Sequence, residues 1–109
     1  MLGLLQGPAF AHATLQSATP APNGAAAFVK EIRLSFSESV DPKFSGVELK
    51  DRAGKTIATG TASIDPKDKK ELIVPVSSEL PAGAYTVDWH AVSEDTHRVK
   101  GTFTFQVVR

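Results

Sequence analysis

Two side chains that can bind a metal stand close together near the end of the chain. They are Asp95 and His97, with Thr96 between them. In an extended chain, positions i and i+2 project to the same side, so we expect the carboxylate and the imidazole to emerge together. An Asp-x-His pair alone is a weak signal, because a surface hydrogen bond between the two side chains explains it as well. A metal site needs further ligands from elsewhere in the chain.

His12 is the candidate for those ligands. Residues 1–11 are apolar and end in Ala-Phe-Ala, the small-x-small pattern of a signal-peptidase site. We interpret residues 1–11 as the remnant of an export signal, although the basic n-region is missing. An N-terminal tail or strand is the alternative. Cleavage after Ala11 would leave residues 12–109 as the mature domain, with His12 first.

An N-terminal histidine offers two nitrogens, its α-amine and its imidazole, which close a small chelate ring on one metal. With His97 and Asp95, the set becomes three nitrogens and one oxygen. Such a set suits a tetragonal Cu(II) ion, whereas zinc prefers a tetrahedral site with thiolates or more histidines. The reference pKa of the α-amine is about 7.7–8, so copper must displace a proton to use it.

The segments on both sides of the pair have the pattern of strands. Apolar and polar residues alternate over residues 85–89 and again over residues 103–107, the period expected of half-buried strands. Trp89 belongs to the inward set, and His90 should therefore face outward. We predict a hairpin whose loop spans residues 93–100 and is closed by Gly101.

The remainder of the chain also predicts strands and no convincing helix. Residues 32–36 alternate with the apolar side chains inward, and Gly54 closes a hairpin turn. Pro75 cannot donate to a ladder, so the strand over residues 71–76 should lie at an edge or contain a bulge. About seven strands at regular spacing predict an all-β fold, a Greek-key β-barrel or sandwich that is immunoglobulin-like.

Composition excludes several classes of function. The 109 residues suit one domain, and 12 basic residues balance 12 acidic ones, so no basic stripe favours nucleic acid as a partner. The absence of cysteine excludes disulfides and thiol nucleophiles. No apolar run approaches the roughly 18–20 residues that span a bilayer, so stable membrane insertion is not expected.

Four segments of the chain form a recognisable set: His-Ala-Thr-Leu at 12–15, Leu-Ser-Phe-Ser-Glu at 34–38, Leu-Pro-Ala-Gly-Ala-Tyr-Thr-Val-Asp-Trp at 80–89 and Val-Ser-Glu-Asp-Thr-His at 92–97. Together they resemble the CopC family of periplasmic copper-resistance proteins. The resemblance covers essentially the whole chain after residue 11. It implies a Greek-key β-barrel that binds Cu(II) very tightly.

The resemblance also implies roles for particular residues. His12, through its amine and imidazole, Asp95 and His97 would be the copper ligands. Glu38 would hydrogen-bond a ligand, as such partners often do, and a solvated loop carboxylate is the alternative. Some members also have a methionine-rich Cu(I) site, but the only methionine here is Met1. We therefore expect a single Cu(II) site, with one Cu(II) ion per chain and no Cu(I) site.

The expected function is periplasmic copper sequestration or trafficking, without enzymatic activity. The expected partners are the copper ion and an inner-membrane copper transporter. One alternative is a copper oxidase with a histidine brace, although the short chain leaves little room for a substrate face. Another is a metal-free immunoglobulin-like interaction module. A Ser93, Asp95, His97 triad is disfavoured, because three side chains from one short extended run cannot pass a proton in line.

Overall fold

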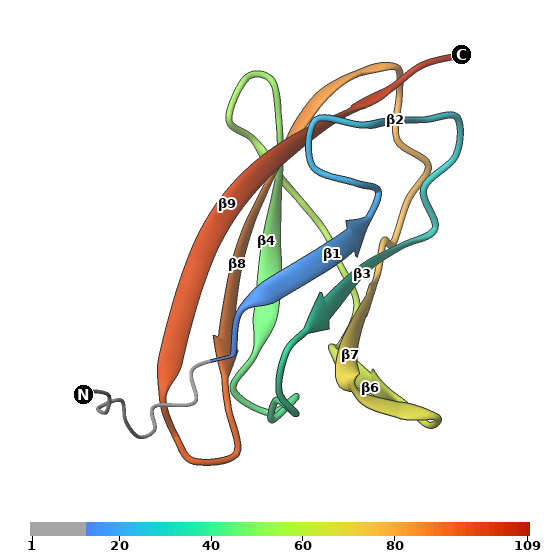
Figure 1. Cartoon of the computed structure of the whole chain (residues 1–109). Coiled ribbons are helices and arrows are strands. Elements are labelled where there is room, and N and C mark those ends of the chain that lie inside the picture. Colours follow the sequence, from blue (N-terminus) through green and yellow to red (C-terminus); the bar gives the residue numbers. More distant parts are fainter. Residues whose placement is uncertain (1–12) are drawn as a thin grey trace, which may run out of the picture.

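The computed structural model describes residues 13–109, which form nine strands and contain no helix (Figure 1). The strands are β1 (Leu15–Thr19), β2 (Ala25–Ala26), β3 (Glu31–Phe36), β4 (Gly46–Asp51), β5 (Thr56–Ile57), β6 (Ser63–Asp65), β7 (Asp68–Pro75), β8 (Gly83–Val92) and β9 (Arg98–Val107). Seven of them have three or more residues, close to the predicted number. Residues 13–109 therefore include no helix long and apolar enough to cross a membrane.

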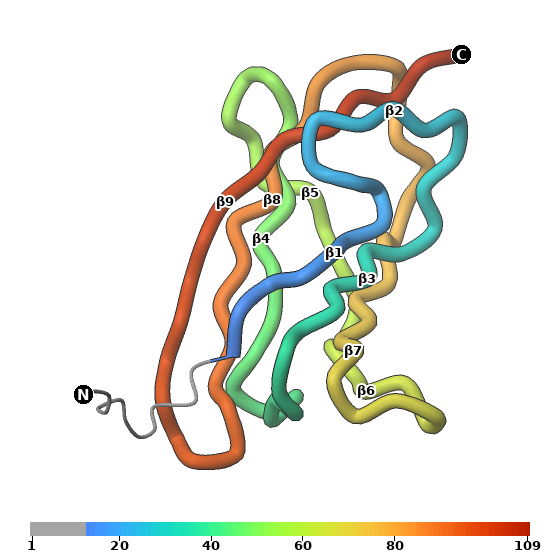
Figure 2. Tube along the Cα trace, in the orientation of Figure 1, coloured from blue at the N-terminus to red at the C-terminus, as the bar shows by residue number. Residues whose placement is uncertain are grey.

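The strands form two sheets that pack face to face (Figures 1 and 2). One sheet has the order β1-β3-β7-β6 and the other the order β2-β9-β8-β4-β5. All pairs are antiparallel except β2 with β9. The predicted all-β, Greek-key sandwich is confirmed, but these two sheets do not close into the barrel that was the other possibility.

The core lies between the sheets and follows the alternation in the sequence. Ile32 and Leu34 of β3 are 0% exposed, as is Val87 of β8, while Phe36 and Phe105 are 1% exposed. Each such side chain stabilises the fold by roughly 1.5–3 kcal/mol relative to an exposed one. The inward set predicted for β3 is therefore confirmed.

The β8–β9 hairpin is longer than the sequence predicted. β8 runs to Val92 and β9 begins at Arg98, so the loop is only 93–97, and Lys100 pairs with His90 inside the ladder. The prediction placed the loop end at Lys100 because the charged residues Arg98 and Lys100 are typical of loops. Those side chains lie on the exposed face of a strand whose inward partner, Val99, is half-buried.

Of the two alternatives predicted for the strand that contains Pro75, the edge position was wrong, whereas the bulge agrees with a register shift in the β6–β7 pairing between Ile64 and Asp65. β7 lies between β3 and β6, inside the four-stranded sheet. Pro75 is the last residue of β7, and its carbonyl accepts a hydrogen bond from the Gly60 amide at 2.8 Å. A proline at the end of a strand leaves the interior ladder intact, so an edge position is not required.

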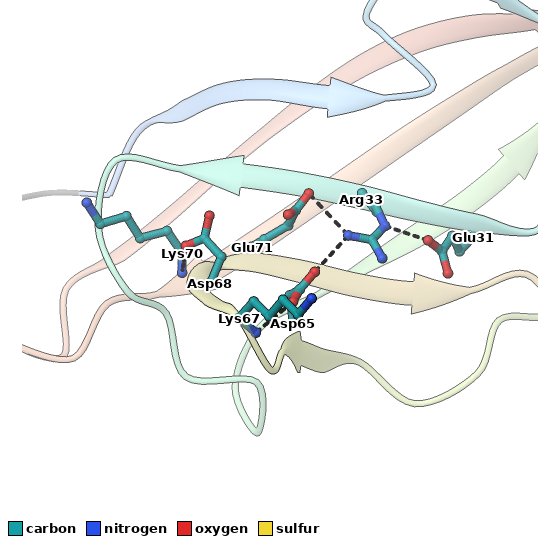
Figure 3. A network of polar contacts seen from close by, with 7 residues as sticks. All are labelled: Glu31, Arg33, Asp65, Lys67, Asp68, Lys70 and Glu71. Carbon is teal, nitrogen blue, oxygen red and sulfur yellow. Dashed lines mark hydrogen bonds and ion pairs between the residues drawn. The ribbon is translucent and has the colours of Figure 1, made fainter.

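One arginine joins three strands on the outer face of that sheet (Figure 3). Arg33 of β3 contacts Glu31 at 2.5 Å, Asp65 of β6 at 3.0 Å and Glu71 of β7 at 3.4 Å. The amide of Lys67 and the Arg33 guanidinium hold the pKa of Asp65 below its usual value. The network braces the sheet that does not bear the Asp95–His97 pair.

A second arginine closes the end of the sandwich opposite the hairpin loop. The guanidinium of Arg109 donates to the Leu80 carbonyl at 2.8 Å and pairs with Glu79 at 3.1 Å. It also lies 5.0 Å from the centroid of the Phe28 ring. The chain end is therefore held at the far end of β8 and β9 (Figure 1).

Trp89 and Gly101 face one another across β8 and β9. A Cβ atom at Gly101 would lie 2.6 Å from Cζ2 of Trp89. The indole also meets the Phe36 ring edge to face, with centroids 5.5 Å apart. Gly101 is needed here because its missing side chain makes room for the indole, which packs at the end of the core nearest the hairpin loop.

We predict that G101A lowers the free energy of unfolding by about 1–3 kcal/mol, the usual cost of overpacking. Urea denaturation followed by tryptophan fluorescence measures it, since Trp89 is the only tryptophan in the chain. T104A, at an exposed position of the same strand, is the control and should change stability little. A G101A protein as stable as the parent would contradict the close packing.

Candidate metal site

The loop that holds the Asp95–His97 pair is a tight turn rather than extended chain. The Ser93 amide donates to the His97 carbonyl at 3.0 Å, and the Thr96 amide donates to the Ser93 carbonyl at 2.9 Å. Thr96 has φ 70°, the left-handed conformation that completes the turn between the bonded residues Ser93 and His97 and usually requires glycine. A β-branched residue in this region stores strain of order 1–3 kcal/mol, typical of functional sites.

Asp95 and His97 are in direct contact, as the sequence predicted. His97 Nδ1 lies 3.2 Å from Asp95 Oδ2, and the His97 amide donates to Asp95 Oδ1 at 3.4 Å. The contact arises from the turn and not from the extended spacing that motivated the prediction. Both side chains are about half exposed, at 47% for Asp95 and 45% for His97, so a dissolved ion can reach them.

Ser93 fixes the position and the charge of the carboxylate. Its hydroxyl is buried and donates to Asp95 Oδ1. This hydrogen bond, followed by those from His97, lowers the pKa of Asp95 below its usual value. Asp95 is therefore ionised at neutral pH and ready to accept a cation.

The order of these contacts excludes a serine-histidine-aspartate triad. Asp95 stands between Ser93 and His97, and it accepts from both. Proton abstraction from a serine nucleophile requires the histidine in the middle. The structure therefore agrees with the rejection of a triad made of these three residues.

The first described residues are anchored near β3. Ala13 is 1% exposed and belongs to the core. The Thr14 amide donates to Ser37 Oγ at 2.9 Å, and the Ser37 amide returns a bond of 2.9 Å to the Thr14 carbonyl. The beginning of the described chain is thus fixed against the segment that follows β3.

That same segment reaches the base of the hairpin loop. Val40 forms a β-bridge with Ser93, and the Asp41 amide donates to the Val92 carbonyl at 2.8 Å. The loop lies at the end of the sandwich where the described chain begins (Figure 2). Glu38 is half-buried in this connecting segment.

The predicted ligand set is only partly within the described structure. Asp95 and His97 come together, whereas His12 lies outside residues 13–109. Among those residues, Glu38 and all other His, Asp and Glu side chains form no cluster of three that could hold a metal ion. The complete four-donor site stays a prediction.

The structure adds two serines to the site. Ser37 anchors the start of the described chain, and Ser93 orients Asp95. The Ser-x-Asp spacing was a possible signal for Ser93. The pairing of Ser37 with Thr14 depends on tertiary contact, so the sequence offered no signal for it. His90 lies on the exposed outer face, as predicted, and is not part of this site.

Comparison with known proteins supplies independent information. A CopC domain match spans residues 15–108. Protein YobA of Escherichia coli K12 is 43% identical over 99 residues, 90% of this chain and 80% of that protein. Copper resistance protein C of E. coli is 40% identical over 114 residues, covering 96% and 90%. The crystal structure of PcoC, a methionine-rich copper resistance protein from E. coli, has a TM-score of 0.82 and 37% identity, covering 90% of this chain and 100% of PcoC.

We predict that S93A raises the pKa of Asp95 toward the ordinary value of about 3.9, because the hydrogen bond to the charged form is lost. Carboxyl-carbon NMR over a pH titration of the metal-free protein measures this change. T96A is the matched control, since the Thr96 hydroxyl donates to the Asp95 backbone carbonyl and not to its carboxylate. If the Asp95 pKa in S93A equals that of the parent, the serine does not set the charge.

Proposed function

This chain belongs to the CopC family, and from that premise we propose that it binds one Cu(II) ion as cargo in the periplasm. The proposed ligands are the α-amine and imidazole of His12, the carboxylate of Asp95 and the imidazole of His97. The observation that supports this most is the exposed Asp95–His97 pair at the end of the sandwich where the buried Ala13 lies.

The anchoring of the first described residues supports the proposed ligand set. Consecutive Cα atoms are about 3.8 Å apart, so position 12 starts beside the anchored Ala13. The segment that anchors Thr14 is itself bonded to the base of the loop. The described residue that adjoins position 12 is thus held at the same end of the sandwich as the loop, which supports the proposed ligand set.

The donor chemistry favours Cu(II) over Cu(I). Imidazole, amine and carboxylate donors suit Cu(II), while Cu(I) prefers thioethers and thiolates. The name of PcoC describes it as methionine rich, but this chain has no cysteine and only Met1 as a possible thioether. When bound, the metal supplies a charge that Asp95 balances, and Ser93 and the turn hold that carboxylate in place.

Glu38 is proposed to hydrogen-bond a ligand from the connecting segment. Groups that orient a metal ligand are often worth 10–100-fold in affinity, about 1.4–2.8 kcal/mol. The half-buried position of Glu38, next to Ser37, suits this role better than a fully solvated carboxylate would. The role extends the proposal and adds no metal ligand.

Transport rather than catalysis is the proposed role. Two of the relatives are named copper resistance proteins, and an inner-membrane copper transporter is the proposed partner that receives or supplies the ion. The oxidase alternative would require peroxide to be consumed in the presence of a reductant. A metal-free interaction module would leave the strained loop and its ionised carboxylate without a purpose.

We predict that protein beginning at His12 binds Cu(II) much more tightly than protein that retains residues 1–11. In the longer form the nitrogen of His12 is an amide, so the two-nitrogen chelate is lost. Competition against a chelator of known affinity should show at least a tenfold difference, about 1.4 kcal/mol. Equal affinities of the two forms would refute the role of the amine.

Ligand substitutions provide a second test on the protein that begins at His12. H97A and D95N should each weaken Cu(II) binding by at least about tenfold and change the electron paramagnetic resonance spectrum, since each removes one donor. H90A and E94Q are matched controls, because they alter an exposed histidine and the neighbouring loop carboxylate. A site elsewhere would be indicated if the control variants and the ligand variants bound copper equally.

A further inference from the structure

The lower half of β9 is an open sheet edge beside the candidate metal site. β2 covers the outer side of β9 only at Gln106 and Val107 (Figure 2). From Arg98 to Phe103, no strand among residues 13–109 pairs with that side. The open edge begins at the residue that follows His97.

The hydrogen-bond pattern shows which backbone groups face outward. Ser93 and His97 form a hydrogen-bonded pair, and such pairs alternate along an antiparallel ladder. The N–H and C=O groups of Arg98, Lys100 and Thr102 therefore point away from β8. The same register continues toward Val107, since the Thr104 carbonyl, on the outer side of β9, accepts a hydrogen bond of 2.7 Å from the Asn23 amide.

The charged side chains of this edge are positive. The side chains of Arg98 and Lys100 are exposed, and neither forms an ion pair with any residue from 13 to 109. Arg98 and Lys100 also line an open depression of about 610 Å³, together with Phe44 and His90. Phe44 is 60% exposed, an unusual position for a large aromatic side chain.

We propose that the edge Arg98–Thr102 binds an extended acidic segment of a protein partner as an added strand. The unpaired backbone groups would supply the main-chain hydrogen bonds of this binding mode. The open depression would accept side chains of the segment and so select among partners. Carboxylates of the segment would pair with Arg98 and Lys100. The inference rests on the proposed copper function, because docking here places the partner next to Asp95 and His97.

Basic residues on an edge strand also prevent unwanted pairing between copies of a protein. That role predicts no affinity for an acidic strand, so binding experiments separate the two explanations. Positive charge alone would bind an acidic peptide without using the backbone. A substitution that removes one edge N–H separates this case from strand addition.

The probe is a fluorescent ten-residue peptide of alternating glutamate and valine, with a lysine and valine peptide as the comparison. Anisotropy with the protein that begins at His12, metal-free and copper-loaded, should show binding of the acidic peptide only. Amide NMR shifts should be largest at Arg98, Lys100 and Thr102. R98E/K100E should weaken binding at least tenfold, while K67E/K69E, with the same change in net charge on the other sheet, should not.

T102P should also weaken binding, because proline removes an N–H that faces the open edge and is tolerated at such positions. Tryptophan fluorescence confirms that each variant is folded, and Cu(II) titration is measured separately. The proposal is overturned if the peptide does not bind, if T102P binds it as the parent does, or if the two charge variants behave alike. Failure of Cu(II) binding with intact peptide binding would instead refute the proposed function alone.

Discussion

The arrangement depends on one continuous ladder, the pairing of β8 with β9 from Gly83 and Val107 to Val92 and Arg98. Every second residue of these strands packs into the core, so a slip of one position would move the buried set to the solvent. The ladder therefore fixes the register of its own turn. A turn held this firmly can keep Thr96 in a left-handed conformation that a mobile loop would relax.

The candidate site also depends on a segment that connects distant parts of the chain. The segment 37–41 is bonded to Thr14 on one side and to Val92 and Ser93 on the other. Its contacts are backbone and hydroxyl hydrogen bonds, which have fixed directions. The start of the described chain and the hairpin loop are thus placed relative to one another by these hydrogen bonds.

The alternation of apolar and polar residues predicted most of the strands, because the burial of one face of a strand determines this alternation directly. The inward set of β3 and the hairpin turn at Gly54, with φ 85°, follow from local chemistry. The first residues of β9 were predicted as loop, because their outward-facing charged side chains are of types that also occur in loops. Ala25 and Ala26 form β2 and pair with β9, a parallel contact that no local pattern indicates.

The candidate site was predicted for a partly incorrect reason. Asp95 and His97 were expected together because extended chain would place them on one side, yet a tight turn brings them together. The contribution of Ser93 required knowledge of its burial, which depends on the Val40 bridge. Residue types therefore indicated the candidate donors Asp95 and His97, while tertiary contacts determine the orientation and charge of these side chains.

The position of Arg109 gives the molecule a direction. Its contacts with Leu80 and Glu79 hold the chain end at the opposite pole from the loop of Asp95 and His97 (Figure 1). Any tether attached after Arg109, whether to a surface or to another protein, would leave from that pole. The loop of Asp95 and His97 would then lie at the end of the sandwich that faces away from the attachment point.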